Sequence, residues 1–268
     1  MKNLKKRYRY SIILLKELVR TDFKLKYQGS ILGYLWSLLR PLLIFLILYI
    51  VFTKFLKIGS GIQNYPVYLL LGILLWNYFV EVTSGSVNAI VGKSDLLRKI
   101  NFPKYVIIFA ISISALINLS LTSIVIVVFM YIGHVTVTLQ SLWLIPLIIE
   151  LILISTGVAF FLSTAFVRFR DISYIWEVLI QAAFYATPIL YPLGEIPASA
   201  AKLLILNPVA QVIQDSRNVL VTKQADNINT IYGGNIYIWL IPTGLTIVTV
   251  TLSALYFRNK SRYFAEEA

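Results

Sequence analysis

The sequence predicts an all-α integral membrane protein with six transmembrane helices. The first observation is composition: 58% of the 268 residues are hydrophobic, 13% are charged, and the mean hydropathy is +0.78. Soluble globular proteins contain roughly 45–50% apolar and about 25% charged residues, and a soluble fold of this length cannot bury so many apolar side chains. The other two observations are six long apolar runs and a one-sided distribution of basic residues.

Six runs are long enough to cross a hydrocarbon core about 30 Å thick, which requires roughly 20 apolar residues per helix. They are Leu38–Phe55, Val67–Val91, Tyr105–Ile132, Leu142–Val167, Ile172–Leu190 and Ile236–Phe257. We therefore expect a single membrane domain over residues 1–268. It has a surface segment at 1–37, a six-helix region at 38–257 that includes an outer connection at 192–235, and a tail at 258–268.

Basic residues set the orientation of these spans. Nineteen of the 24 lysines and arginines fall in residues 1–40, 92–104, 168–171 and 258–268, which an even number of spans places on one side. The positive-inside rule makes that side the cytoplasm and puts both termini there. Basic residues next to apolar spans also contact anionic lipids, so the net charge of +12 does not indicate nucleic-acid binding.

The segment from Tyr10 to Tyr27 predicts an amphipathic helix that lies in the cytoplasmic membrane interface. Apolar residues recur at helical spacing, and basic residues follow another face at intervals of four. The apolar set is Ile12, Leu15, Val19 and Phe23, and the basic set is Lys16, Arg20 and Lys24. The alternative is a solvated start to the first span.

The outer connection predicts two further short amphipathic helices. The first covers Ala198–Leu206, and the second starts at Asn207-Pro208, where Asn suits the cap and Pro the first helical position. Gly233-Gly234 marks a turn into the last span. Pro192 should end the fifth span, because proline cannot continue the hydrogen-bond ladder of a helix.

Catalytic and metal chemistry are poorly supported. The chain contains no Cys and one His, which excludes disulfides, thiol chemistry and a multi-histidine metal site within one subunit. Gly92-Lys93-Ser94 lacks the glycine spacing and the preceding strand of a phosphate-binding loop, so we expect no ATP site and no cofactor in this chain. We expect neither catalytic nor metal-binding residues.

Three carboxylates are candidates for buried charge, namely Glu81, Glu150 and Glu177. Intramembrane acids suggest function by default, but no basic residue lies one helical turn from any of them. A proton relay is therefore unsupported.

Aromatic residues within two of the spans offer stacking surfaces for sugar rings. Phe45, Tyr49 and Phe52 share one face of the first span, and Phe184, Tyr185 and Tyr191 come from the fifth, although Phe184 and Tyr185 cannot both point inward. Aromatic faces pack on the apolar faces of sugar rings. The alternative places the stripe against lipid or another helix.

Five short motifs, in order along the chain, resemble one family. Residues 27–41 read YQGSILGYLWSLLRP, in which Tyr27, Ser30, Leu32, Gly33, Leu35, Trp36 and Pro41 match a Y-x-x-S-x-L-G-x-L-W-x-x-x-x-P pattern. LLRKINFP at 96–103, FRDI at 169–172, TPILYP at 187–192 and LNP at 206–208 follow. Together they resemble the type-2 ABC exporter permeases that move lipid-linked polysaccharides and teichoic acids. Thr187 departs from the commoner Ser and keeps the hydroxyl.

The resemblance implies a permease without enzymatic activity in the bacterial cytoplasmic membrane. Two copies form a homodimer, and two separate cytoplasmic ABC ATPase subunits carry the ATP and Mg²⁺. The substrate is a lipid-linked glycan, such as O-antigen, a capsule-like glycan or wall teichoic acid, which moves from the inner to the outer leaflet. The alternatives are a small-molecule exporter of the same superfamily, a stand-alone secondary carrier or channel, and an intramembrane enzyme, which would need a polar catalytic cluster.

The resemblance also suggests roles for particular residues. For docking of a lipid diphosphate we expect Lys24, Lys26 and Arg40. For coupling to the ATPase we expect Asp95, Arg98, Lys99, Asn101, Phe102 and Pro103, in an inner loop where 95–99 can form a short helix that Phe102-Pro103 ends. Arg168, Arg170 and Asp171 form a second anchor, in which the charges can pair locally and Asp171 favours the helix start. For an outer gate we expect Thr187, Pro188, Pro192, Asn207 and Pro208.

Overall fold

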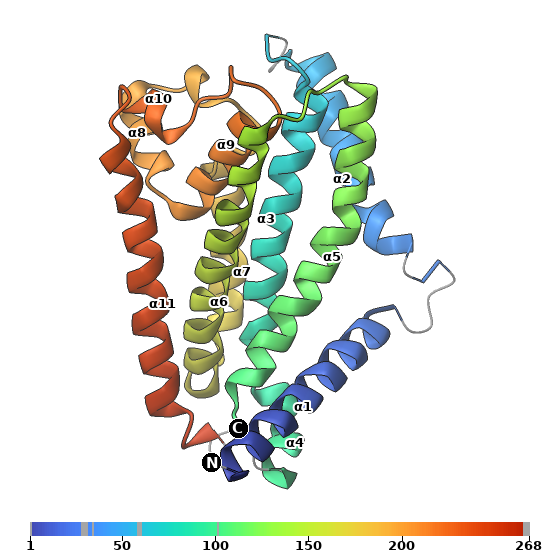
Figure 1. Ribbon diagram of the computed structural model, residues 1–268, viewed down its shortest axis with the longest axis vertical. Helices are drawn as coiled ribbons and strands as arrows, with labels where there is room; N and C mark the ends of the chain where they lie inside the picture. Colours follow the sequence, from blue (N-terminus) through green and yellow to red (C-terminus); the bar gives the residue numbers. More distant parts are fainter. Residues whose placement is uncertain (1, 28–31, 34, 58–60, 101, 265–268) are drawn as a thin grey trace.

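The computed structural model is a bundle of long helices with a cluster of short helices at one end (Figure 1). It describes residues 2–27, 32–33, 35–57, 61–100 and 102–264, with the backbone alone at 2–10, 23, 25–27 and 236. No strand occurs within these ranges. The α-helices are α1 Lys2–Tyr27, α2 Leu35–Ile50, α3 Tyr65–Val87, α4 Ser94–Lys99, α5 Tyr105–Ile132, α6 Leu144–Arg168, α7 Ile172–Ala186, α8 Ala198–Ile205, α9 Pro208–Leu220, α10 Ile228–Ile231 and α11 Leu240–Lys260.

Five helical stretches in the described part are long and apolar enough to cross a membrane. They are Leu35–Phe55, Tyr65–Val87, Tyr105–Ile132, Leu139–Arg168 and Tyr237–Lys260. The first includes a π-helical turn, Val51–Phe55, that continues α2. Each coincides with one of the predicted runs, so five of the six are present as predicted.

The fifth predicted run gives a shorter helix than expected. Its helix, α7, has 15 residues, or about 22 Å at 1.5 Å per residue, and ends at Ala186. Thr187 is extended, with φ −82° and ψ 134°, because the ring of Pro188 disfavours a helical conformation for the residue before it. The expectation that Pro192 ends this helix is therefore wrong, and Pro188 ends it.

Helix α3 is the centre of the bundle. It packs against α2, α5, α6, α7 and α9, and most of its side chains are buried. Helix α11 packs along α6 at one side. In Figure 1 the start of α1, the end of α11 and α4 lie at one end of the bundle, which we call the inner end, and α8 and α10 lie at the opposite, outer end.

Helix α1 begins at Lys2, before the predicted start at Tyr10. One part of its surface packs against the helical bundle, and another part exposes apolar residues. Its residue Leu18 is buried in the main core, and the helix contacts α5. Ile12 stays exposed, and the Asp22 carboxylate is 3.0 Å from the ammonium of Lys93. The helix is thus attached to the inner end of the bundle.

The outer connection contains α8 and α9 where the sequence predicts two helices. Asn207 caps α9 as predicted, because its Oδ1 accepts the backbone N–H of Val209 at 3.0 Å. However, every residue from Pro208 to Asn218 is buried, since α9 lies among α3, α6, α8, α10 and α11. Five of its polar side chains therefore bond inside the protein instead of facing water along one side, namely Gln211, Gln214, Asp215, Arg217 and Asn218.

Candidate functional site

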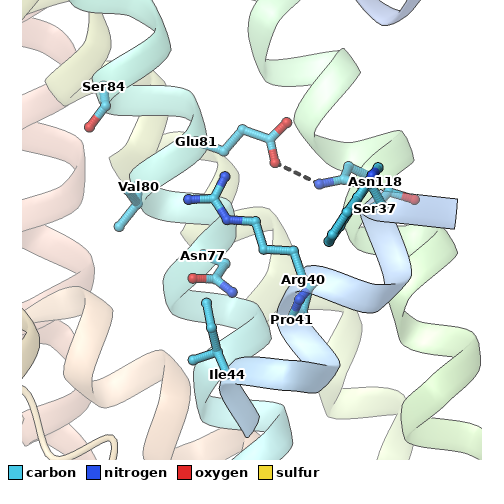
Figure 2. Close-up of a pocket in the computed structure, with 10 residues that line it drawn as sticks. Ser37, Arg40, Pro41, Ile44, Asn77, Val80, Glu81, Ser84 and Asn118 are labelled. Atoms are coloured by element: carbon cyan, nitrogen blue, oxygen red, sulfur yellow. Dashed lines mark hydrogen bonds between the residues drawn. The ribbon is translucent and has the colours of Figure 1, made fainter. Parts of the chain in front are cut away.

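A polar cavity of about 550 Å³ lies between α2, α3 and α5 (Figure 2). Helix α2 contributes a cation and a hydroxyl, and α3 contributes a carboxylate, an amide and a hydroxyl. Its lining consists of Trp36, Ser37, Arg40, Pro41, Ile44, Asn77, Val80, Glu81, Ser84 and Asn118. These groups can bind the polar head of a ligand whose remainder stays in an apolar phase.

Arg40 and Glu81 share this cavity although they come from different helices. Figure 2 shows the Arg40 guanidinium directed at α3, beside Asn77 and Glu81. The Asn118 amide donates to Glu81 Oε2 at 2.8 Å, which links α5 to α3. A guanidinium can bind a phosphate through two parallel hydrogen bonds. Spacing along one helix could not reveal this neighbourhood, because the two charges meet only through the packing of α2 on α3.

The other two predicted docking residues do not line the cavity. Lys24 is exposed on α1, and the side chain of Lys26 lies outside the described residues. Of the predicted docking residues whose side chains the structure describes, Arg40 lines this cavity and Lys24 does not.

The predicted aromatic stripe of α2 does not form one open face. Phe45 is 3% exposed, and its ring meets Phe129 of α5 edge-on at 5.3 Å between centroids. It also stacks on Tyr49 at 5.7 Å, and Tyr49 and Phe52 are half-buried. Phe45 therefore packs against another helix of the same subunit. This agrees with the alternative interpretation of the stripe, which places it against lipid or another helix.

The predicted aromatic lining from the fifth span has both buried and exposed members. The Phe184 ring packs on Trp76 of α3 at 6.0 Å, whereas Tyr185 is 70% exposed. The Tyr191 hydroxyl donates to the backbone carbonyl of Tyr185 at 3.1 Å. Of these three, Tyr185 presents most of its ring to the surroundings of the subunit.

The inner loop forms the short helix that the sequence predicts. In α4 Asp95 lies in the first turn, and Arg98 and Lys99 lie exposed in the last. Phe102 is buried in the main core and Pro103 is half-buried, while Asn101 lies outside the described residues. The loop therefore offers charged groups on α4, and Phe102 anchors it to the bundle.

The predicted local charge pairing at 168–171 is wrong. Arg168 lies over the Phe169 ring at 5.4 Å and Arg170 over Phe166 at 5.2 Å. Asp171 is the N-cap residue of α7 but accepts no capping hydrogen bond. All three charged residues are exposed, and the described structure contains no ion pair between them. The guanidinium groups are instead placed by contact with phenylalanine rings.

The residues of the predicted outer gate lie in a densely bonded region. Thr187 is buried at the end of α7, and the carbonyl of Pro188 accepts from Gln214 Nε2 at 3.0 Å and from Arg217 Nη1 at 2.7 Å. Pro192 precedes the 3-10 turn Leu193–Glu195, and Asn207 and Pro208 lie at the start of α9. The break after α7 is thereby fixed by side chains of α9.

Arg217 is the main residue that sequence reasoning missed in this region. It is fully buried, its Nε donates to the carbonyl of Tyr68 at 2.9 Å, and its guanidinium lies 3.7 Å from the Tyr68 ring centroid. Burial lowers the pKa of the Arg217 guanidinium from its ordinary value, yet an arginine keeps its proton in proteins. The sequence signal was available, since six polar residues occupy the eight positions 211–218 of α9.

On another side of α9, the Asp215 carboxylate accepts hydrogen bonds from three groups. They are the Gln211 amide at 2.5 Å, the Trp239 indole at 2.8 Å and the backbone N–H of Ile228 at 3.2 Å. Burial raises the pKa of the Asp215 carboxyl, and these donors act against that shift. Asp215 thus connects α9 to α10 and to the start of the last span.

The described residues contain no cluster of three or more metal-binding side chains. The described part of the chain is thus a helical membrane domain with a cavity between three of its spans, an architecture that suits a membrane transporter.

The comparisons with known proteins then identify the family. The chain belongs to the ABC-2 type transporter membrane family, whose sequence model matches residues 13–221. It is 32% identical over 259 residues to an O-antigen export system permease protein, RfbA, of Klebsiella pneumoniae, covering 96% of this chain and 95% of the relative. An RfbA of Myxococcus xanthus is 27% identical over 262 residues, which cover 97% and 96% of the two chains. The polysialic acid transport protein KpsM of Escherichia coli is 23% identical over 211 residues, which cover 78% and 81%.

Proposed function

We propose that this chain is the transmembrane subunit of an ATP-driven exporter of a lipid-linked polysaccharide in the bacterial cytoplasmic membrane. The observation that carries the proposal is the similarity, over almost the whole of both chains, to permeases named for O-antigen export. A more distant relative is named for transport of polysialic acid, which is also a polysaccharide. The common substrate class is a long, polar glycan.

The proposed topology has six crossings, with both termini in the cytoplasm. Helix α7 is short, and we expect the buried segment 187–190 to complete its crossing. Because α1 starts and α11 ends at the inner end, an even number of crossings fits the arrangement in Figure 1. The positive-inside rule, applied to the basic residues of the inner segments, favours the cytoplasm for that end.

The proposed machine contains two copies of this chain and two ABC ATPase subunits, which hold the ATP and Mg²⁺. The exposed charges of α4 and of residues 168–171 are the candidate contacts with the ATPase. Helices α2 and α7 both pack on α3 and expose apolar residues on their other sides. These exposed sides are the candidate interface with the second copy. Wall teichoic acid remains a possible cargo beside the polysaccharides.

We propose that the glycan crosses between the two copies, past Tyr185. A polar polymer cannot cross in contact with acyl chains, so it requires a path lined by protein. Tyr185 has an open ring for stacking on sugars, and Tyr49 and Phe52 can add to the lining, whereas Phe45 is occupied in packing. The lipid diphosphate would dock in the cavity of Arg40, whose guanidinium suits phosphate oxygens.

The exporter assignment is tested by co-expression with a candidate ABC ATPase subunit. We expect the two proteins to co-purify, and we expect glycan to reach the outer leaflet of proteoliposomes only when ATP is supplied. Transport by this chain alone, without nucleotide, would refute the assignment and favour a secondary carrier.

The path is tested by Tyr185→Ala, with Tyr131→Ala as the control. Tyr131 is also highly exposed but lies at the outer end of α5. We expect Tyr185→Ala to reduce export several-fold through the loss of one stacking contact, which is worth roughly 0.5–1.5 kcal/mol, while assembly and ATP hydrolysis persist. Equal export by the two variants would remove Tyr185 from the path.

A further inference from the structure

Arg217 joins three segments that are far apart in the sequence. From its position on α9 the side chain donates to the carbonyl of Tyr68 on α3 and to those of Pro188 and Ile189 after α7. These distances are 2.9, 2.7 and 2.6 Å, and each uses a different nitrogen of the guanidinium. A planar group with fixed donor directions therefore sets the relative positions of α3, α9 and the break that ends α7.

Helix α3 is built to accept this guanidinium. A Cβ added at Gly72 would lie 2.2 Å from Arg217 Nη2 and 3.0 Å from its Cζ. The guanidinium therefore occupies the space that a side chain at position 72 would need. Tyr68, one turn earlier, presents its ring face to the guanidinium at 3.7 Å.

Neighbouring side chains hold the same segment. Gln214 donates to the carbonyl of Pro188 at 3.0 Å, and the Tyr65 hydroxyl donates to the carbonyl of Leu190 at 2.9 Å. Three consecutive carbonyls after α7 are thus bonded by side chains of α9 and α3.

Stability alone is a poor reason for a buried arginine at this place. No carboxylate pairs with it in the described structure, and its partners are neutral carbonyls and an aromatic ring. Burying a charge is costly, and apolar side chains of similar volume often stabilise a core as well or better. What an apolar replacement cannot supply is the fixed direction of several donors.

We propose that Arg217 is a positioning residue of the transport cycle, which fixes α9 and the break after α7 to α3 so that these segments move as one body. This inference rests on the proposed export function for its transport measurement. It implies that α8–α10 do not swing away from the bundle to open the outer side. Opening then occurs at the surface that α7 offers to a second copy.

The test uses Arg217→Lys, which keeps the charge and removes the fork of donors. We expect amide hydrogen exchange across 187–206 to rise about tenfold, the factor expected for loss of about one hydrogen bond to a charged group, while exchange in the middle of α6 stays unchanged. We also expect the amount of glycan exported per ATP hydrolysed to fall. A residue that only supports folding would lower the yield of complex and leave that ratio unchanged.

A pair of glycine variants keeps the test independent of Arg217 itself. Gly72→Ala should reproduce the effects of Arg217→Lys, because its methyl group would displace the guanidinium. Gly85→Ala in the same helix is the control, since its methyl group would meet only the Cγ2 methyl of Ile111, at 3.3 Å. Equal exchange and equal export in the two glycine variants would overturn the proposal.

Two further results would also overturn it. One is unchanged exchange together with a normal export ratio in Arg217→Lys. The other is a rise in exchange across 187–206 of the unmodified protein when its ATPase is trapped with ATP and vanadate. Exchange across 187–206, measured on the permease alone in nanodiscs, reports how firmly the break and α8 are held without ATPase or glycan. A failure of the export function is therefore distinguishable from a failure of this inference.

Discussion

Replacing Phe45 by Ala should lower the stability of the subunit more than any change at an exposed aromatic residue of the same helix. Phe45 is 3% exposed and its ring has two aromatic neighbours, Tyr49 and Phe129. A Phe→Ala change costs about 3–5 kcal/mol in soluble cores. Part of that cost comes from the transfer of the apolar side chain out of water. In a membrane this part is missing, so we expect a loss of about 2–3 kcal/mol in the free energy of unfolding.

The measurement is unfolding in mixed micelles at increasing fractions of a denaturing detergent. Phe55→Ala is the control, because Phe55 is 77% exposed and should change the free energy of unfolding by less than about 0.5 kcal/mol. A double-mutant cycle with Phe129→Ala should give a coupling of about 0.5–1.5 kcal/mol. A loss below about 1 kcal/mol with no coupling would refute the packing role and return Phe45 to the proposed glycan path.

Two other substitutions test the outer cap and the inner loop. Asn207→Ala should destabilise the protein by about 1 kcal/mol, because the N–H of Val209 loses its acceptor, and thermal unfolding measures this directly; unchanged stability would contradict the role of the cap. Arg98→Ala removes an exposed charge from α4, so binding of the ATPase should weaken several-fold while stability stays unchanged. Phe102→Ala should weaken binding as well, and because Phe102 is buried it should in addition lower the stability by about 3–5 kcal/mol. Pull-down with the ATPase and thermal unfolding separate the two, and full binding by Arg98→Ala would exclude that residue from the contact.

Features that depend on neighbours along the chain could be predicted from the sequence. Long apolar runs gave the positions of five spans, and the Asn-Pro pair located the start of α9 together with its cap. The short helix α4 was predicted from the charged residues before Phe102-Pro103. The end of α7 was placed too late, because Pro188 was taken as part of the span although its effect on Thr187 is also local.

Features that depend on the packing of different helices could not be predicted. Arg40 and Glu81 share a cavity only because α2 lies on α3, and Arg217 finds its acceptors on α3 and after α7. From the sequence Arg217 counts simply as a basic residue on the outer side. Phe45 illustrates the same limit, since helical periodicity shows which residues share a face but not what that face contacts.

The attachment of α1 has a mechanical consequence for the inner end. The short segment that carries α4 is supported twice: through the ion pair between Lys93 and Asp22 of α1, and through Phe102, which is buried where α5 begins. Because α1 itself packs on α5, both supports lead to the same long helix. A load applied at α4 therefore divides between two parallel routes, whose stiffnesses add. Removing either support alone would soften the linkage of α4 to α5 without disconnecting it.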